Sequence, residues 1–252
     1  MSPSNILTRT KVPEVTLGFW LIKIAATTLG ETGGDAVSMS MQLGYLVGTA
    51  IFAAMFLVAV WAQVRATSFH PFLYWVTIMA TTMVGTTLAD FADRTLGIGY
   101  AGGTSLLLVL LIASLLVWHR ATGSVSMGTV STPRAEPFYW VTIMFSQTLG
   151  TALGDWTADT AGLGYTGAAL IFGGLLALIV AAHFLTRISA TLLFWAAFIL
   201  TRPLGAVVGD FLDKPVAAGG LALSRYSASL ALLAFMVLGI LLFRQRAAEQ
   251  SH

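Results

Sequence analysis

Long apolar runs separated by short polar breaks dominate the chain. The runs 106–118, 168–182 and 230–243 approach, with their flanks, the roughly 20 residues that a membrane-spanning helix needs. They lack the alternating polarity of outer-membrane strands, and in lipid a helix satisfies its own backbone hydrogen bonds. The pattern therefore predicts an all-α, polytopic membrane protein with eight transmembrane helices. The expected spans are 14–38, 44–63, 72–95, 100–118, 138–160, 165–184, 190–212 and 220–243.

A two-helix repeat occurs four times. Each copy begins with an aromatic residue followed by tryptophan, at Trp20, Trp75, Trp140 and Trp195. Counting positions from this Trp, position ten is always glycine and position fifteen always aspartate. The predicted repeats are 14–63, 72–118, 138–184 and 190–243, with a linker at 121–137, in one transmembrane domain spanning 1–252. Because each copy contains two spans, the copies should insert in the same orientation.

This pattern, with its aromatic–Trp start and Gly-x(4)-Asp core, resembles a bacterial family of membrane-anchored proteins known by a repeat of unknown function. The resemblance covers approximately residues 11–243. It implies a protein of the bacterial cytoplasmic (inner) membrane with four tandem repeats, and it implies no substrate.

Composition supports a membrane location and argues against several other kinds of function. The chain is 57% hydrophobic and 10% charged, with a mean hydropathy of +0.84, whereas a soluble domain is about 25% charged. The net charge of +2 is scattered, which gives no sign of nucleic-acid binding. Cysteine is absent, so disulfides and thiolate metal sites are excluded.

The distribution of lysine and arginine predicts the orientation. Eight bases fall in loops on the side of the termini, whereas Arg94 and Lys214 lie in turns on the opposite side. By the positive-inside rule, both termini should be cytoplasmic. The tryptophans that open the repeats should form an aromatic belt at the cytoplasmic interface.

Acidic residues recur inside the predicted membrane region. They form four pairs spaced three or four residues apart: Glu31 and Asp35, Asp90 and Asp93, Asp155 and Asp159, Asp210 and Asp213. On a helix this spacing places both carboxylates on one face, where they could hold a cation or share a proton. The sequence therefore predicts a metal-binding or proton-binding site at these eight residues.

Other positions of the repeat extend this polar face. Position seven supplies pathway residues Thr27, Thr82 and Gln147, while Arg202 at the same position and Lys23 are candidate counter-ions or gates. Position ten supplies Gly30, Gly85, Gly150 and Gly205, which would let the acid-bearing helices pack closely around a pseudo-fourfold or twofold axis.

Charged side chains inside a membrane require neutralisation. A charge near the centre of a spanning helix costs about 2.5–3.5 kcal/mol on insertion scales. The functional interpretation is a cation site or pathway; the structural alternative is that the acids cap the outer helix ends and pair with Arg94 and Lys214. All-oxygen ligands suit Mn²⁺, Mg²⁺ or Ca²⁺, as well as protons.

The sequence favours a transporter of a small cation, such as a hard divalent metal, with or without proton coupling. Three alternatives stay open: an organic-cation carrier, an intramembrane metal-dependent enzyme, and a structural or sensory membrane module. The expected partners are the lipid bilayer and the cation, and the chain could act as a monomer or a homodimer.

Overall fold

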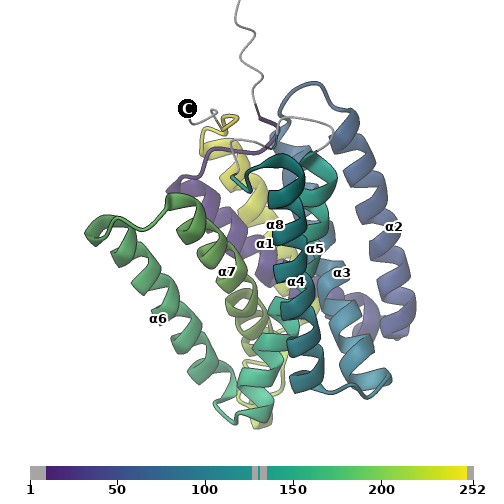
Figure 1. Ribbon diagram of the computed structural model, residues 1–252. Coiled ribbons are helices and arrows are strands. Elements are labelled where there is room, and N and C mark those ends of the chain that lie inside the picture. The colour runs from purple at the N-terminus through teal and green to yellow at the C-terminus, as the bar shows by residue number, and fades with distance from the viewer. Residues whose placement is uncertain (1–9, 127–129, 131–134, 249–252) are drawn as a thin grey trace, which may run out of the picture.

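The computed structural model describes residues 10–126, 130 and 135–248. Within these ranges the protein contains eight long α-helices and no β-strand (Figure 1). The helices are α1 (Leu17–Asp35), α2 (Gly44–Arg65), α3 (Pro71–Asp90), α4 (Tyr100–Thr122), α5 (Ala135–Asp155), α6 (Gly164–Leu185), α7 (Ala190–Asp213) and α8 (Arg225–Leu242). Part of the predicted linker, at 127–129 and 131–134, lies outside the described residues, as do Arg9 and Arg134.

The last helix begins later than the sequence pattern predicted. We expected a span from residue 220, whereas α8 starts at Arg225. The intervening chain folds back onto the end of α7, where the backbone N–H of Leu221 donates to Phe211 O at 2.7 Å and that of Leu223 donates to Leu212 O at 2.9 Å. These bonds satisfy carbonyls near the helix end and occupy residues that would otherwise extend α8.

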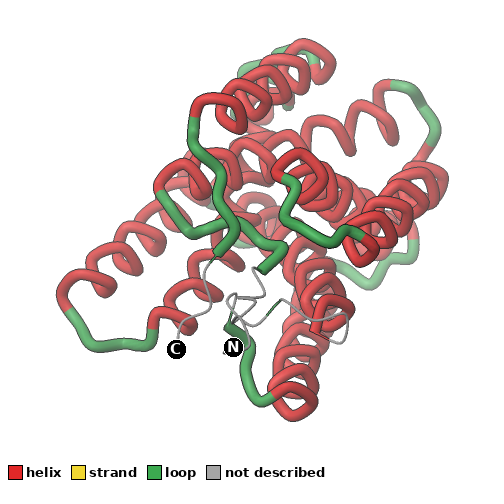
Figure 2. Tube along the Cα trace, turned by 90° about the horizontal axis from the view of Figure 1, so that it is seen from above, coloured by secondary structure: helices red, strands yellow, loops and turns green. Residues whose placement is uncertain are grey.

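The four acid-bearing helices form a closed inner ring. Helix α1 packs against α3, α3 against α5, α5 against α7, and α7 against α1. This arrangement confirms the expected packing of these helices around one axis and makes it pseudo-fourfold. Both described ends of the chain lie at one end of the bundle, which Figure 2 shows from above.

The outer helices cover the inner helices of the neighbouring repeat. Helix α2 packs on α3, α4 on α5, and α6 on α7, and α8 closes the circle on α1. Each repeat therefore supplies the outer cover of the next one, and the fourth repeat covers the first.

The position-ten glycines set the distance between inner helices. A Cβ at each glycine would overlap the position-seven residue of the next helix around the ring: Gly30 against Thr82, Gly85 against Gln147, Gly150 against Arg202 and Gly205 against Thr27. The same contact recurs at all four interfaces, so the helices keep one register. Hydroxyl bonds support it: Thr27 donates to Thr201 O at 3.2 Å, and Thr82 donates to Ala26 O at 3.3 Å.

The surface of the bundle is apolar. Six helices, α2, α3, α4, α6, α7 and α8, are long and apolar enough to cross a membrane. Large side chains such as Leu170, Phe184 and Leu242 are mostly exposed, while threonines and carboxylates fill the interior. This distribution is the reverse of that in a water-soluble bundle, and it fits a multi-pass membrane protein.

Candidate functional site

One aspartate from each inner helix lies at the end of the ring distant from the chain termini. Asp35, Asp90, Asp155 and Asp210 are all at most 3% exposed. In the first three repeats the aspartate is the last α-helical residue, and a five-residue π-helical turn follows it directly. Such turns often occur at functional sites because they redirect side chains at a helix end.

Two bases bridge these aspartates in neighbouring pairs. The Arg94 guanidinium lies 2.8 Å from Asp90 and 3.5 Å from Asp155. The Lys214 ammonium lies 2.7 Å from Asp35 and 2.9 Å from Asp210. This is the pairing expected if the acids have a structural role. Burial lowers the pKa of Lys214, but attraction to Asp210 and Asp35 outweighs burial and raises the pKa above its ordinary value, so the ammonium stays protonated.

A fully buried arginine joins all four inner helices one turn deeper. Arg202 of α7 donates to Glu31 of α1 at 3.0 Å and to Thr86 of α3 at 2.6 Å, and it also donates to Thr151 of α5. These three partners occupy position eleven of their repeats. In repeat four that position is Ala206, whose small side chain leaves room for the arginine rising from position seven.

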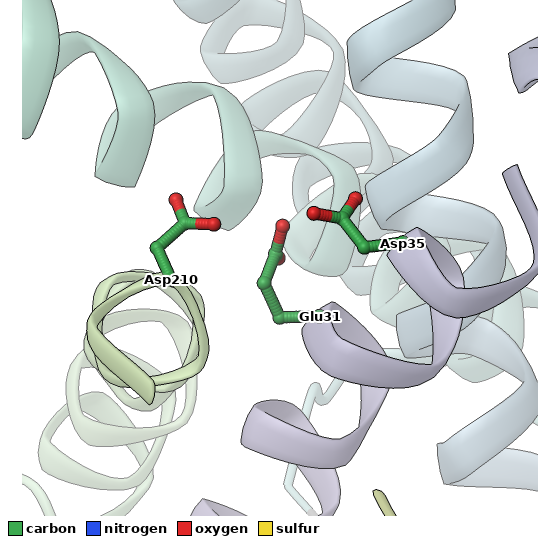
Figure 3. A group of neighbouring side chains, drawn as sticks. All are labelled: Glu31, Asp35 and Asp210. Atoms are coloured by element: carbon green, nitrogen blue, oxygen red, sulfur yellow. The ribbon is translucent and has the colours of Figure 1, made fainter. Parts of the chain in front are cut away.

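Three carboxylates converge between α1 and α7. Glu31, Asp35 and Asp210 each offer an oxygen, and the three oxygens all lie within 4.8 Å of one another. Figure 3 shows the side chains leaving their two helices and turning toward a shared space. The set can bind a cation that prefers oxygen ligands. The group therefore contains the predicted pair of repeat one, Glu31 and Asp35, together with Asp210 of repeat four.

The second acids of the other repeats are not part of this group of three carboxylates. Asp93 points toward α4, where its carboxylate contacts Gly103. Asp159 is exposed on the surface. Asp213 accepts a hydrogen bond from Arg225 at 2.9 Å.

Sequence reasoning missed Arg225. This arginine begins α8 and also lies 3.7 Å from Asp35, so it joins the same ion-pair network. It is a third base on the side of Arg94 and Lys214. The signal was present, since Arg225 follows Asp213 by twelve residues across the turn that connects the two helices of repeat four.

Polar residues continue along the axis toward the termini. Thr27, Thr82 and Gln147 are fully buried at the level from which Arg202 rises. Lys23 lies deeper, also fully buried, with its ammonium 4.1 Å from the centre of the Phe198 ring.

The tryptophans close the terminal end of the ring, and the predicted interfacial belt is wrong. Trp75, Trp140 and Trp195 are at most 4% exposed and pack with neighbouring aromatic residues inside the bundle. The tyrosines beside two of them share a hydrogen bond of 2.7 Å, between Tyr74 and Tyr139. The repeat spacing explains this, since a residue two helical turns before position seven falls on the same, inward-facing side.

The described segments before α1 and after α8 cover this aromatic end. Lys11 forms an ion pair with Glu136 at 2.7 Å and donates to the carbonyl of Val64 at the end of α2 at 2.9 Å. Backbone pairing between Pro13 and Ala247 ties the two terminal segments together.

Comparison with known families gives four matches along the chain. The family described as Repeat of Unknown Function (DUF347) matches residues 18–69, 73–124, 138–189 and 193–247. The four-copy organisation predicted from the sequence is thereby confirmed. Neither the curated proteins nor the solved structures that were compared gave a match.

Proposed function

The chain belongs to the family of the Repeat of Unknown Function (DUF347), and from the geometry of its four repeats we propose that it carries a small cation across a membrane. The cation would be a hard divalent metal such as Mn²⁺, with or without coupling to protons. The main support is the convergence of Glu31, Asp35 and Asp210, whose carboxylates are almost fully buried with oxygens within 4.8 Å of one another.

The balance of charge favours a cation. Six carboxylates and four bases take part in the ion pairs described at this end of the ring. The acids are Glu31, Asp35, Asp90, Asp155, Asp210 and Asp213; the bases are Arg94, Arg202, Lys214 and Arg225. With all of them ionised, two negative charges remain in excess. One divalent cation or two protons would neutralise this excess, and buried charges need such neutralisation.

Lys214 would act as a tethered cation within the site. Its ammonium lies between Asp35 and Asp210, the same carboxylates that would bind a metal. An arriving cation would displace it toward solvent, to which the Lys214 side chain is already 12% exposed. The ion pair would therefore stabilise the carrier without substrate. Because the cation would take over the carboxylates that Lys214 leaves, the empty and the loaded carrier would differ little in free energy.

All eight helices would span the membrane, including the more polar α1 and α5. Together with the π-helical turns that follow them, these helices reach Ser40 and Thr160. At 1.5 Å per residue each extends over more than about 30 Å, the thickness of the hydrocarbon core. Their polar side chains face the ring axis, so lipid would contact mainly their apolar neighbours.

The site would open on the outer face of a bacterial inner membrane. Both termini would be cytoplasmic, because the bases outside the spans concentrate at the terminal end. Arg225 raises the number of bases on the opposite side to three, which leaves the prediction unchanged.

Cation flux into proteoliposomes tests the proposal. The double variant Asp35→Asn, Asp210→Asn should abolish uptake of the transported cation from a panel that includes Mn²⁺, Mg²⁺ and Ca²⁺. Asp159→Asn is the matched control, since Asp159 is exposed and should leave uptake unchanged. Uptake by the double variant equal to that of the wild type would reject the carboxylate route.

A further inference from the structure

A second group of polar side chains lies in the terminal half of the ring, beyond Arg202. Lys23, Gln147 and Arg202 come from α1, α5 and α7, and each side chain is fully buried. Among the described residues, no hydrogen-bond partner exists for the Lys23 ammonium, for either atom of the Gln147 amide, or for Nε and Nη1 of Arg202. Three neighbouring helices thus contribute unpaired polar groups to the interior.

These groups share one region of the axis. The Arg202 stem packs on Gly150, one turn along α5 from Gln147 on the same face of that helix. Lys23 and Arg202 lie on facing sides of neighbouring helices, since Thr27, one turn after Lys23 on α1, donates to the carbonyl of Thr201, next to Arg202 on α7, at 3.2 Å. The ammonium also sits 4.1 Å above the ring of Phe198, which precedes Arg202 by one turn.

This region contains two bases, Lys23 and Arg202, and one carboxylate, Glu31, in contrast to the acidic end. Glu31 is the carboxylate bonded to Arg202, and it contacts only Nη2 of the guanidinium. Two other nitrogens of the guanidinium, Nε and Nη1, and the Lys23 ammonium have no hydrogen-bond partner among the described residues. A buried, uncompensated charge is costly, so an anion at this position would stabilise the fold.

We propose that a single small anion, either a halide ion or a carboxylate of about the size of acetate, binds between Lys23, Gln147 and Arg202. Lysine and arginine supply the charge, and the Gln147 amide supplies a neutral donor that fixes the anion beside α5. The site adjoins the candidate cation site, because Arg202 also donates to Glu31 at 3.0 Å, but the anion proposal does not require that the protein transports a cation.

Thermal unfolding of the full chain in a non-ionic detergent tests this site. Wild-type protein is compared in sodium chloride, sodium bromide, sodium acetate and sodium gluconate at equal ionic strength. Gluconate is the bulky reference anion. The bound anion should raise Tm by about 3 °C or more over gluconate, because a ligand that binds only the folded state stabilises it. A rise with chloride and bromide identifies a halide site, and a rise with acetate alone identifies a carboxylate site.

Two variants locate the effect. Lys23→Met should lose the anion-dependent rise and should be more stable than the wild type in gluconate, since no unpaired ammonium remains. Arg187→Met removes an exposed arginine outside the ring and should keep the rise in full. An equal rise in Lys23→Met and wild type would overturn the assignment.

Equilibrium dialysis of the wild type gives a measurement that does not depend on folding of a variant. Radiolabelled chloride should be retained by the protein and displaced by bromide; if acetate alone raises Tm, radiolabelled acetate replaces it. Equal Tm in all four salts together with no retained anion would refute the proposal.

Discussion

Arg202 and Glu31 should depend on each other for the stability of the ring. Their side chains are 0% and 3% exposed and lie 3.0 Å apart, so neither charge reaches water. Arg202→Met leaves Glu31 without its basic partner, and Glu31→Gln leaves Arg202 without its acidic one. Removal of one member of a buried pair costs about 3–5 kcal/mol. For a chain of this size we expect each single variant to lower Tm by about 10 °C.

The double variant should be no less stable than either single variant. It retains neither charge, and replacement of a buried ion pair by neutral groups of similar size is often close to neutral. The coupling between the two sites should therefore reach about 3 kcal/mol, well above the roughly 0.5 kcal/mol seen between independent sites.

Tryptophan fluorescence during thermal unfolding in detergent measures these differences, because the chain has seven tryptophans. Arg187→Met is the matched control, an exposed arginine whose loss should change stability by less than about 0.5 kcal/mol. Destabilisation of the double variant by the sum of the two single effects would refute the reasoning, since additive effects mean that the two residues do not interact.

Three further outcomes are expected. Gly85→Ala places a methyl group 2.9 Å from a backbone carbon of α5, so α3 and α5 must move apart, and thermal unfolding should show a loss of stability of about 1–3 kcal/mol. The control Gly173→Ala on α6 meets no atom within 4 Å and should be neutral or stabilise the protein by at most about 1 kcal/mol. Lys214→Gln should bind Mn²⁺ roughly tenfold more tightly in calorimetric titration, because the competing ammonium is gone; unchanged affinity would argue against competition. Single cysteines at Ile98 and Thr186, introduced into a chain without native cysteine, should react with an impermeant maleimide from opposite sides of the membrane, and labelling from the same side would contradict the eight-span topology.

The repeat spacing carried most of the information about the inner ring. A constant distance from tryptophan to glycine and aspartate fixes one register for four helices, and it predicts that Gly85 and Asp90 face the same interior as their counterparts. Two unusual residues of repeat four were also visible in the sequence: position eleven is Ala206 instead of a polar residue, and position seven is Arg202. Only the structure shows that Arg202 reaches the other three inner helices and donates hydrogen bonds to their residues at position eleven.

The neighbours of the outer helices could not be predicted. Helices α2, α4 and α6 are apolar on all sides, so no stripe marks the face that packs inward. Short connections join α2 both to the helix before it and to α3, so loop length does not decide between these neighbours, and only the structure shows that α2 packs on α3. The candidate cation site depends on this geometry too, because Asp210 joins Glu31 and Asp35 only once the ring has closed.

Closure of the ring by α8 sets a condition on the order of biosynthesis. Of the eight helices, α1 is made before all the others, whereas α8, which shields it, is made after them. Until then one flank of α1, which includes Ile22 and Thr32, has no cover from its own chain. Nascent chains that stop before α8 would expose that flank, which gives chaperones and proteases a direct means to distinguish them from chains that contain α8.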